Sequence, residues 1–222
     1  MLQIPLTFLT SLKENNNREW FAENRKQYEQ ARDEFASYAT QLIPLINEFD
    51  SSLGPIEAKD CIFRIFRDVR FSLNKDPYKE NMGAYIARGG RKRGFAGYYF
   101  HLEPGNSFIS GGIYMAPTDV MRRIREDIDL YSAEFLSIVE NPPFKKLFEG
   151  MGEEKLKRVP AGFSAESPVA DYLKLKHITP FRSLSDKEVS DAKIINKTIE
   201  TFRALSPLVA FLNRSIEGMQ KG

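Results

Sequence analysis

The chain has 222 residues, of which 42% are hydrophobic and 28% are charged. This length suits one large domain or two small ones, and the composition provides for a real core and a soluble surface. A single cysteine excludes an internal disulfide and fits a reducing compartment. No run of about 18 apolar residues is present, which excludes a membrane-spanning helix, and the first residues lack the pattern of a signal peptide. We therefore expect a cytoplasmic protein.

Positive charge is concentrated in one segment of the chain. The formal net charge is only +2. Residues 59–93 hold ten Lys and Arg against four Asp and Glu, a balance of +6, so the rest of the chain carries −4. This asymmetry favours an anionic partner. The alternative is internal compensation, in which acidic helices elsewhere pair with the basic segment.

The N-terminal part of the sequence is predicted to be helical. Leucines at helical spacing predict a short amphipathic helix from Pro5 to Lys13. Asn17 is then placed to cap a long helix that runs from about Arg18 to about Asp50. Pro44 is expected to kink the last third of that helix.

Residues 58–115 show a pattern typical of strands joined by short turns. Strands are predicted at 62–66, 82–87, 97–103 and 108–115, with turns at 74–77 and 104–106 and a basic, glycine-rich loop at Gly89–Gly94. Because short turns join neighbouring strands that run in opposite directions, the sheet is predicted to be antiparallel.

Helices return after this region. They are predicted at about 117–129, with Thr118 or Asp119 as cap, at 132–140, 144–148 and 168–175, with brief extended pieces at 158–160 and 177–181. Ser185 and Glu188 form a capping box before a last helix, which is expected to cover about 186–217 and to break near Pro207. The sequence thus predicts a single α+β domain over residues 1–222, with a central antiparallel sheet at about residues 58–115 flanked by N- and C-terminal helices.

The segment Arg64–Asn81 is the most informative part of the chain. It is too charged for an ordinary buried strand and too aromatic for an ordinary solvated loop, so its charges must pair with one another or face a ligand. If the segment is extended, Arg67 lies on its apolar face and is the structural arginine. We expect four residues to reach solvent in a shared cleft, namely Arg64, Arg70, Lys75 and Tyr78. The alternative is an Arg–Asp network around Asp68 that stabilises the fold.

We predict that this segment binds a small anionic ligand or an acidic peptide. The expected ligand-binding residues are Arg64, Arg67, Asp68, Arg70, Lys75, Tyr78, Lys79, Asn81 and His101. One alternative is an enzyme that uses the same pocket, with His101 or Asp68 in proton transfer. Another is a nucleic-acid or protein interaction module built on the loop Gly89–Gly94 and the aromatic residues 98–100, with nucleic acid the less favoured partner.

Metal and nucleophile chemistry has little support in the sequence. The two histidines, His101 and His177, are far apart and have no partner at zinc-ligand spacing, so we expect neither a metal nor another cofactor. His101 is expected to lie on a strand and to share a face with Tyr99 and Glu103. Cys61 is expected to be an inert, buried thiol.

Several motifs resemble one protein family. The longest is R-x-x-R-D-x-R-F-x-x-x-K-x-P-Y-K-x-N, from Arg64 to Asn81. Others are NNNREWF at 15–21, GYYFHLEPG at 97–105, GGIYM at 111–115 and PAGF at 160–163. Together they resemble DUF2461, a bacterial family with some fungal members. The resemblance spans nearly the whole chain, and it implies positions rather than roles because that family has no assigned function.

Overall fold

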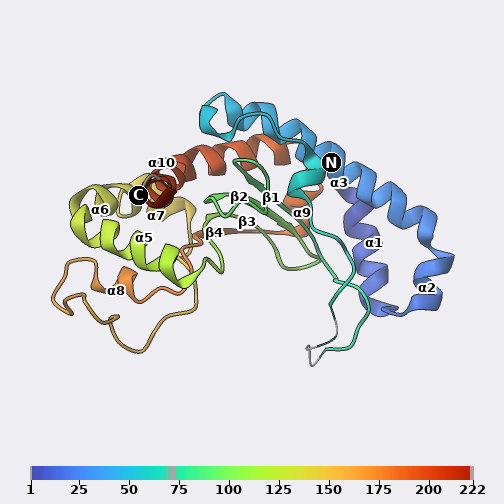
Figure 1. Ribbon diagram of the computed structural model, residues 1–222. Helices are drawn as coiled ribbons and strands as arrows, with labels where there is room; N and C mark the ends of the chain where they lie inside the picture. Colours follow the sequence, from blue (N-terminus) through green and yellow to red (C-terminus); the bar gives the residue numbers. More distant parts are fainter. Residues whose placement is uncertain (1, 69, 71–73, 221–222) are drawn as a thin grey trace.

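An antiparallel sheet and two long helices organise the chain, which is described by a computed structural model at residues 2–68, 70 and 74–220 (Figure 1). The helices are α1 (Gln3–Glu14), α2 (Arg18–Glu23), α3 (Arg25–Asn47), α4 (Ala58–Cys61), α5 (Thr118–Leu130), α6 (Ser132–Val139), α7 (Pro142–Leu147), α8 (Ala170–Leu173), α9 (Asp186–Val189) and α10 (Ile194–Gln220), with a 3-10 turn at Ser51–Leu53. The strands are β1 (Met82–Ala87), β2 (Gly97–Leu102), β3 (Ser107–Gly112) and β4 (Phe181–Leu184), in the spatial order β1-β2-β3-β4. This arrangement confirms the α+β class.

One face of the sheet packs against α3 and α10. Side chains alternate along a strand, so Tyr98 and Phe100 of β2 point to the same side. The Phe100 ring centre lies 4.9 Å from that of Tyr38 in α3, and the Tyr98 ring centre lies 5.1 Å from that of Phe202 in α10. The Tyr98 hydroxyl donates to the Asp50 carboxylate at 2.7 Å. These contacts join both long helices to one layer of core side chains.

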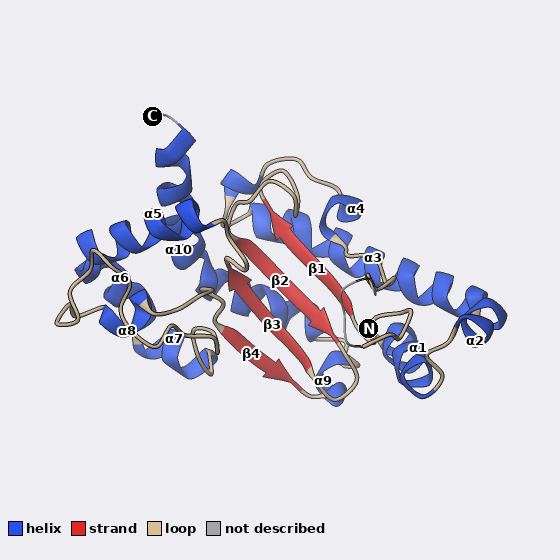
Figure 2. Ribbon diagram, turned by 60° about the horizontal axis from the view of Figure 1, so that its bottom comes forward, coloured by secondary structure: helices blue, strands red, loops and turns tan. Residues whose placement is uncertain are grey.

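No helix of the described chain crosses the opposite face of the sheet (Figure 2). The strand register aligns the side chains of this uncovered face in two rows. One row holds Tyr85, Tyr99, Ser110 and Phe181, and the other holds Gly83, His101, Phe108 and Ser183. The uncovered face is therefore aromatic and polar, whereas the packed face is mainly apolar.

The predicted strand at 62–66 is wrong. This segment makes only isolated bridges, between Ile62 and Ala84 and between Phe66 and Tyr78. The fourth strand of the sheet is instead β4, which pairs with β3 from a position more than sixty residues further along the chain. Residues 177–181 had been predicted to be extended, but nothing local in the sequence indicates their pairing with β3.

Side-chain caps start some of the described helices, among them α2, α7 and α9. The Asn17 side chain accepts from the Trp20 N–H at 2.9 Å, which confirms Asn17 as a cap. The expected single helix after it is divided at Asn24, whose side chain donates to the Trp20 carbonyl and so competes with the helix backbone. The capping box of Ser185 and Glu188 is confirmed, although it starts the short α9.

Three other details of the helices differ from the prediction. Pro117, and not Thr118 or Asp119, precedes α5, and no side chain caps that helix. Pro207 lies inside a continuous α10, and α9 is a separate helix.

None of the described helices combines the length and the apolar character that crossing a membrane would need.

Asn213 connects α10 to the start of β2, and its substitution tests this join. Its carboxamide accepts from the Ala96 N–H at 2.8 Å and donates to the Ala96 C=O at 3.1 Å, and the residue is 8% exposed. Asn213→Ala leaves both buried backbone groups without this partner. We expect the free energy of unfolding, measured by urea denaturation, to fall by about 2–4 kcal/mol.

The matched control is Gln41→Ala, because Gln41 is exposed on α3 and bonds only within its own helix. We expect its effect to stay within about 0.5 kcal/mol. A loss below about 1 kcal/mol for Asn213→Ala would show that this join contributes little.

Candidate functional site

Residues 62–81 form an arm at the β1 edge of the sheet (Figure 1). Its two halves pair with each other, because the Arg67 N–H donates to the Pro77 carbonyl at 3.0 Å and the Lys79 N–H donates to the Ile65 carbonyl at 2.8 Å. Residues 69 and 71–73 of the conspicuous motif lie outside the described residues. We refer to the part next to β1, with Phe63, Arg64 and Lys79, as the root of the arm.

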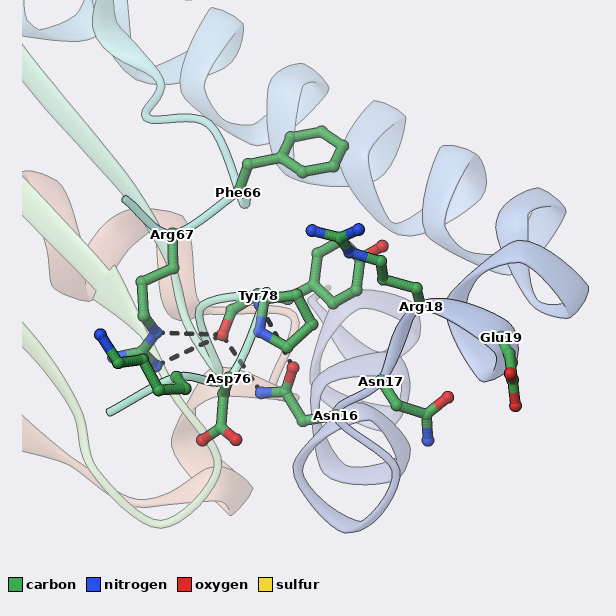
Figure 3. A pocket seen from close by; sticks show the side chains of 10 residues that line it. Asn16, Asn17, Arg18, Glu19, Phe66, Arg67, Asp76 and Tyr78 are labelled. Atoms are coloured by element: carbon green, nitrogen blue, oxygen red, sulfur yellow. Dashed lines mark hydrogen bonds between the residues drawn. The ribbon is translucent and has the colours of Figure 1, made fainter. Parts of the chain in front are cut away.

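The arm is anchored on the N-terminal helices by Tyr78 (Figure 3). The Tyr78 ring stacks on Phe21 with ring centres 3.9 Å apart. The Asn16 carboxamide donates to the Tyr78 carbonyl at 3.1 Å and accepts from the Tyr78 N–H at 3.2 Å. Arg67 donates to the same carbonyl through Nε and Nη2, both at 3.3 Å. Tyr78 is only 6% exposed. The expectation that it reaches solvent is therefore wrong, and its role is to anchor the arm.

A cleft of about 870 Å³ opens between this anchor and the turn from α1 to α2 (Figure 3). Its lining residues are Asn16, Asn17, Arg18, Glu19, Phe66, Arg67, Lys75, Asp76, Pro77 and Tyr78. The cations of this lining are nearly balanced by its two carboxylates. Asn16, Asn17 and Arg67 already bond backbone groups. The polar groups of the cleft therefore mainly hold the arm against the N-terminal helices, and they offer little to a strongly charged ligand. Of the residues expected to share a cleft, Arg64 and Arg70 are not part of its lining.

Cations gather at the root of the arm, where the charge of Asp68 acts on Arg64 without forming an ion pair. Lys79 is half-buried, and its burial together with the neighbouring Arg64 and Arg67 lowers the pKa of its ammonium group. The Lys79 Nζ lies 5.6 Å from the centre of the Phe63 ring, and the guanidinium carbon of Arg91 lies 5.7 Å from the same centre. Within the described part of the chain, no Asp or Glu forms an ion pair with any of these four cations.

The other predicted residues of the motif lie elsewhere on the arm. Asp68 and Arg70 form an exposed ion pair at 2.7 Å, and the Arg70 side chain lowers the pKa of Asp68 to about 2. A solvent-exposed pair of this kind contributes little stability, so Asp68 is not the centre of a buried network. Lys75 lines the cleft, and Asn81 is half-buried directly before β1.

His101 lies on the uncovered face of the sheet. Its Nδ1 is 2.8 Å from the Tyr99 hydroxyl and its Nε2 is 2.9 Å from the Glu103 carboxylate. The predicted common face of these three residues is thus confirmed. The imidazole is 9% exposed, and burial lowers its pKa although Glu103 acts in the opposite direction. The Tyr99 ring lies 6.3 Å from that of Phe63, which places this group beside the root of the arm.

The basic loop Gly89–Gly94 is partly tied to the fold. Arg91 donates to the carbonyls of Lys59 and Asp60, at 3.1 Å and 2.8 Å. Tyr98 and Phe100, two of the aromatic residues that were considered for base stacking, are buried in the core. Fewer cationic and aromatic groups are therefore available for nucleic acid than the sequence of this region indicates.

The described residues include no group of three or more His, Cys, Asp or Glu that is placed to hold a metal ion. Cys61 is buried as expected, and burial raises the pKa of its thiol to about 11. A thiol in that state is a poor nucleophile at neutral pH.

The sequence pattern did not single out Asn16 or Phe63. Asn17 was predicted to be a cap, and no role was predicted for its neighbour Asn16, although a row of three amides is a signal that could have indicated one. The segment that contains Phe63 was predicted to be a strand, whereas the Phe63 ring is 40% exposed beside two cations. Arg91 was considered only as part of the loop Gly89–Gly94, a candidate contact to nucleic acid or to protein.

Residues 5–211 match a protein family described as "Conserved hypothetical protein (DUF2461)". Because the match covers most of the chain, the chain belongs to this family, as its motifs indicated. Neither the curated proteins nor the solved structures contain a match. Family membership assigns no chemistry, so the function has to be argued from the geometry.

Asn16→Ala tests how the arm is anchored. It removes both bonds to the Tyr78 backbone, and we expect the free energy of unfolding to fall by about 1–3 kcal/mol. The Tyr78 amide should also exchange faster with solvent, as measured by hydrogen–deuterium exchange. Asn15→Ala is the control, because that side chain bonds only the Ser11 carbonyl within α1. Unchanged exchange at Tyr78 in Asn16→Ala would mean that ring stacking alone holds the arm.

Proposed function

We propose that this DUF2461 protein binds a small anionic ligand at the root of the arm. The observation that carries the proposal is the group of cations around Lys79, none of which forms an ion pair with an Asp or Glu of the described chain, although the charge of Asp68 acts on Arg64 from a distance. A carboxylate or phosphate would supply the missing negative charge. The Phe63 ring, 40% exposed beside Lys79 and Arg91, offers an apolar surface to the organic part of such a ligand.

This arrangement of charges is unfavourable in the free protein. Arg64 and Arg67 repel the Lys79 ammonium, and half-burial removes part of its hydration. Asp68, whose charge acts on Arg64, forms its ion pair with Arg70. Clusters of unpaired like charges with a shifted pKa are found preferentially at functional sites, where a ligand offsets the repulsion.

The cations have different roles in the proposed site. Arg67 already donates to the Tyr78 carbonyl, so it acts on a ligand mainly through its charge. Arg64 is exposed, and its planar fork suits the two oxygens of a carboxylate or phosphate. Lys79 supplies a compact charge next to the ring of Phe63.

Proton transfer is a second candidate function. It is favoured by the hydrogen-bonded chain of Tyr99, His101 and Glu103 on the adjoining sheet face. That chain is treated separately below, because it does not depend on the anion site.

Lys79→Met separates a binding role from a structural one. It keeps the apolar stem but removes the charge, so the melting temperature without ligand should stay the same or rise as the repulsion is relieved. Stabilisation of the wild type by phosphate, benzoate or phenylphosphonate should disappear in this variant. The measurement is thermal denaturation at constant ionic strength, with a short glutamate-rich peptide included in the screen.

Arg25→Met is the matched control, because it removes an exposed cation of α3 that is paired with Glu29. It should keep the stabilisation by anions. In the wild type, that stabilisation should weaken as pH rises through the lowered pKa of Lys79, below the ordinary 10.5, because the ammonium then loses its charge. A lower melting temperature for Lys79→Met, together with no anion that stabilises the wild type, would show that Lys79 is structural.

A further inference from the structure

The uncovered face of the sheet carries a chain of hydrogen bonds that anion binding does not use. We propose that Tyr99, His101 and Glu103 form an acid–base catalytic site in which the Tyr99 hydroxyl meets the substrate. The three residues occupy alternate positions along and just beyond β2, so their side chains lie side by side on one face. The Tyr99 oxygen is 2.8 Å from Nδ1 of His101, and Nε2 is 2.9 Å from Glu103.

The partners of the imidazole determine where its proton lies. An ionised carboxylate only accepts, so Nε2 carries the hydrogen and donates it to Glu103. Nδ1 then has the lone pair and accepts from the Tyr99 O–H. This order, in which a hydroxyl is followed by a base and then by a carboxylate that orients the base, is the arrangement by which enzymes activate a hydroxyl group. Burial lowers the pKa of His101, which keeps the imidazole neutral and able to accept a proton at neutral pH.

The surroundings hold this chain in position. The Phe108 ring stacks on the imidazole with ring centres 4.5 Å apart and planes 13° apart. Asn106 donates to the same Glu103 oxygen that faces the imidazole, at 3.1 Å. On the neighbouring strand, a Cβ at Gly83 would lie 2.6 Å from the Tyr99 hydroxyl oxygen. The glycine therefore leaves the space that this hydroxyl occupies.

A ligand can approach this group from the uncovered face. No helix of the described chain crosses that face (Figure 2). Tyr99 and Glu103 are partly exposed, whereas His101 between them is buried, so both ends of the chain reach the surface. The Phe63 ring contacts Lys79 of the arm, Arg91 of the basic loop and Tyr99. If the anion site binds as proposed, the substrate class is a small organic anion that gives up or takes up a proton; this last clause alone rests on the proposed function.

The proposed step balances within the three residues. When the Tyr99 oxygen takes a proton from the substrate, its own proton passes to Nδ1 of His101, and Glu103 stabilises the imidazolium that forms. The reverse transfer returns a proton to the product. Burial raises the pKa of the Tyr99 phenol, so the phenolate does not form in advance and the two transfers are coupled. Tyr99 is the catalytic residue, and Glu103 is a positioning residue.

Sulfonylation of tyrosine tests the proposal without a known substrate. With phenylmethylsulfonyl fluoride, a bond forms between the Tyr99 oxygen and sulfur, the sulfur–fluorine bond breaks, fluoride leaves and the phenol proton passes to His101. This reagent is uncharged, so it does not require the anion site. The rate of labelling at each tyrosine is measured by peptide mass spectrometry as a function of pH.

We expect the labelling of Tyr99 to rise as His101 loses its proton, below the ordinary pKa of about 6.5, and to level off near neutral pH. The charged and titratable groups that act on the pair are Glu103 and Tyr114. Lys79 and Arg91 lie beside the Phe63 ring, which packs against Tyr99. The internal control is Tyr131, which is 46% exposed and packs under Arg214. An exposed tyrosine of this kind should react only in alkaline solution, since ordinary phenols ionise near pH 10.

His101→Gln keeps a hydrogen-bonding side chain but cannot accept the proton. We expect the labelling of Tyr99 at neutral pH to fall at least about tenfold, whereas Gln41→Ala, on the exposed side of α3, should label as the wild type does. Should His101→Gln fail to fold, the pH profile of the wild type still decides. Labelling of Tyr99 that is absent, no faster than that of Tyr131, or rising only in alkaline solution would overturn the proposal and leave the chain as a structural hydrogen-bond network.

Discussion

The alternation of side chains along β2 determines what both faces of the sheet can do. Tyr98, Phe100 and Leu102 are fully buried and connect the sheet to α3 and α10. Tyr99 and His101 must then point to the other face. Because a shift of one residue would exchange the two sets, the packing of the large core rings also fixes the position of the polar chain. Core stability and the proposed chemistry thus depend on the same register.

The arm connects that face to the N-terminal helices. Tyr78 stacks on Phe21, and Asn16 bonds the Tyr78 backbone, so α1 and α2 hold the arm from one side. The other end of the arm places Lys79 and Phe63 at the edge of the sheet, beside Tyr99. Residues from three distant parts of the sequence therefore meet at one edge of the sheet. The charges are concentrated where the arm joins the sheet, and the hydrogen-bonded chain lies next to them.

Local rules account for the parts of the fold that the sequence predicts correctly. Asn17 and the Ser185–Glu188 box cap helices because their partners lie within three residues. The shared face of Tyr99, His101 and Glu103 follows from the two-residue period of a strand.

The parts that were not predicted depend on distant partners. β4 finds β3 across a long stretch of helices and loops, and 62–66 is replaced by β4 as the fourth strand. Tyr78 is buried because Phe21 and Asn16 cover it, which its own neighbours in sequence do not reveal. Within the candidate site, the binding of a ligand by Lys79 and Arg64 stays a prediction. Asp68 forms a surface ion pair with Arg70.

The central claim is that the cations around Lys79 lack a negative charge that a ligand supplies. It is tested most directly by an NMR titration of the Lys79 side chain in protein labelled with ¹³C at lysine Cε. We predict that Lys79 titrates below the ordinary lysine pKa of 10.5 in the free protein, and that its pKa rises when phenylphosphonate is present. A pKa at the ordinary value that does not move at high concentrations of phenylphosphonate, phosphate or benzoate would contradict the account.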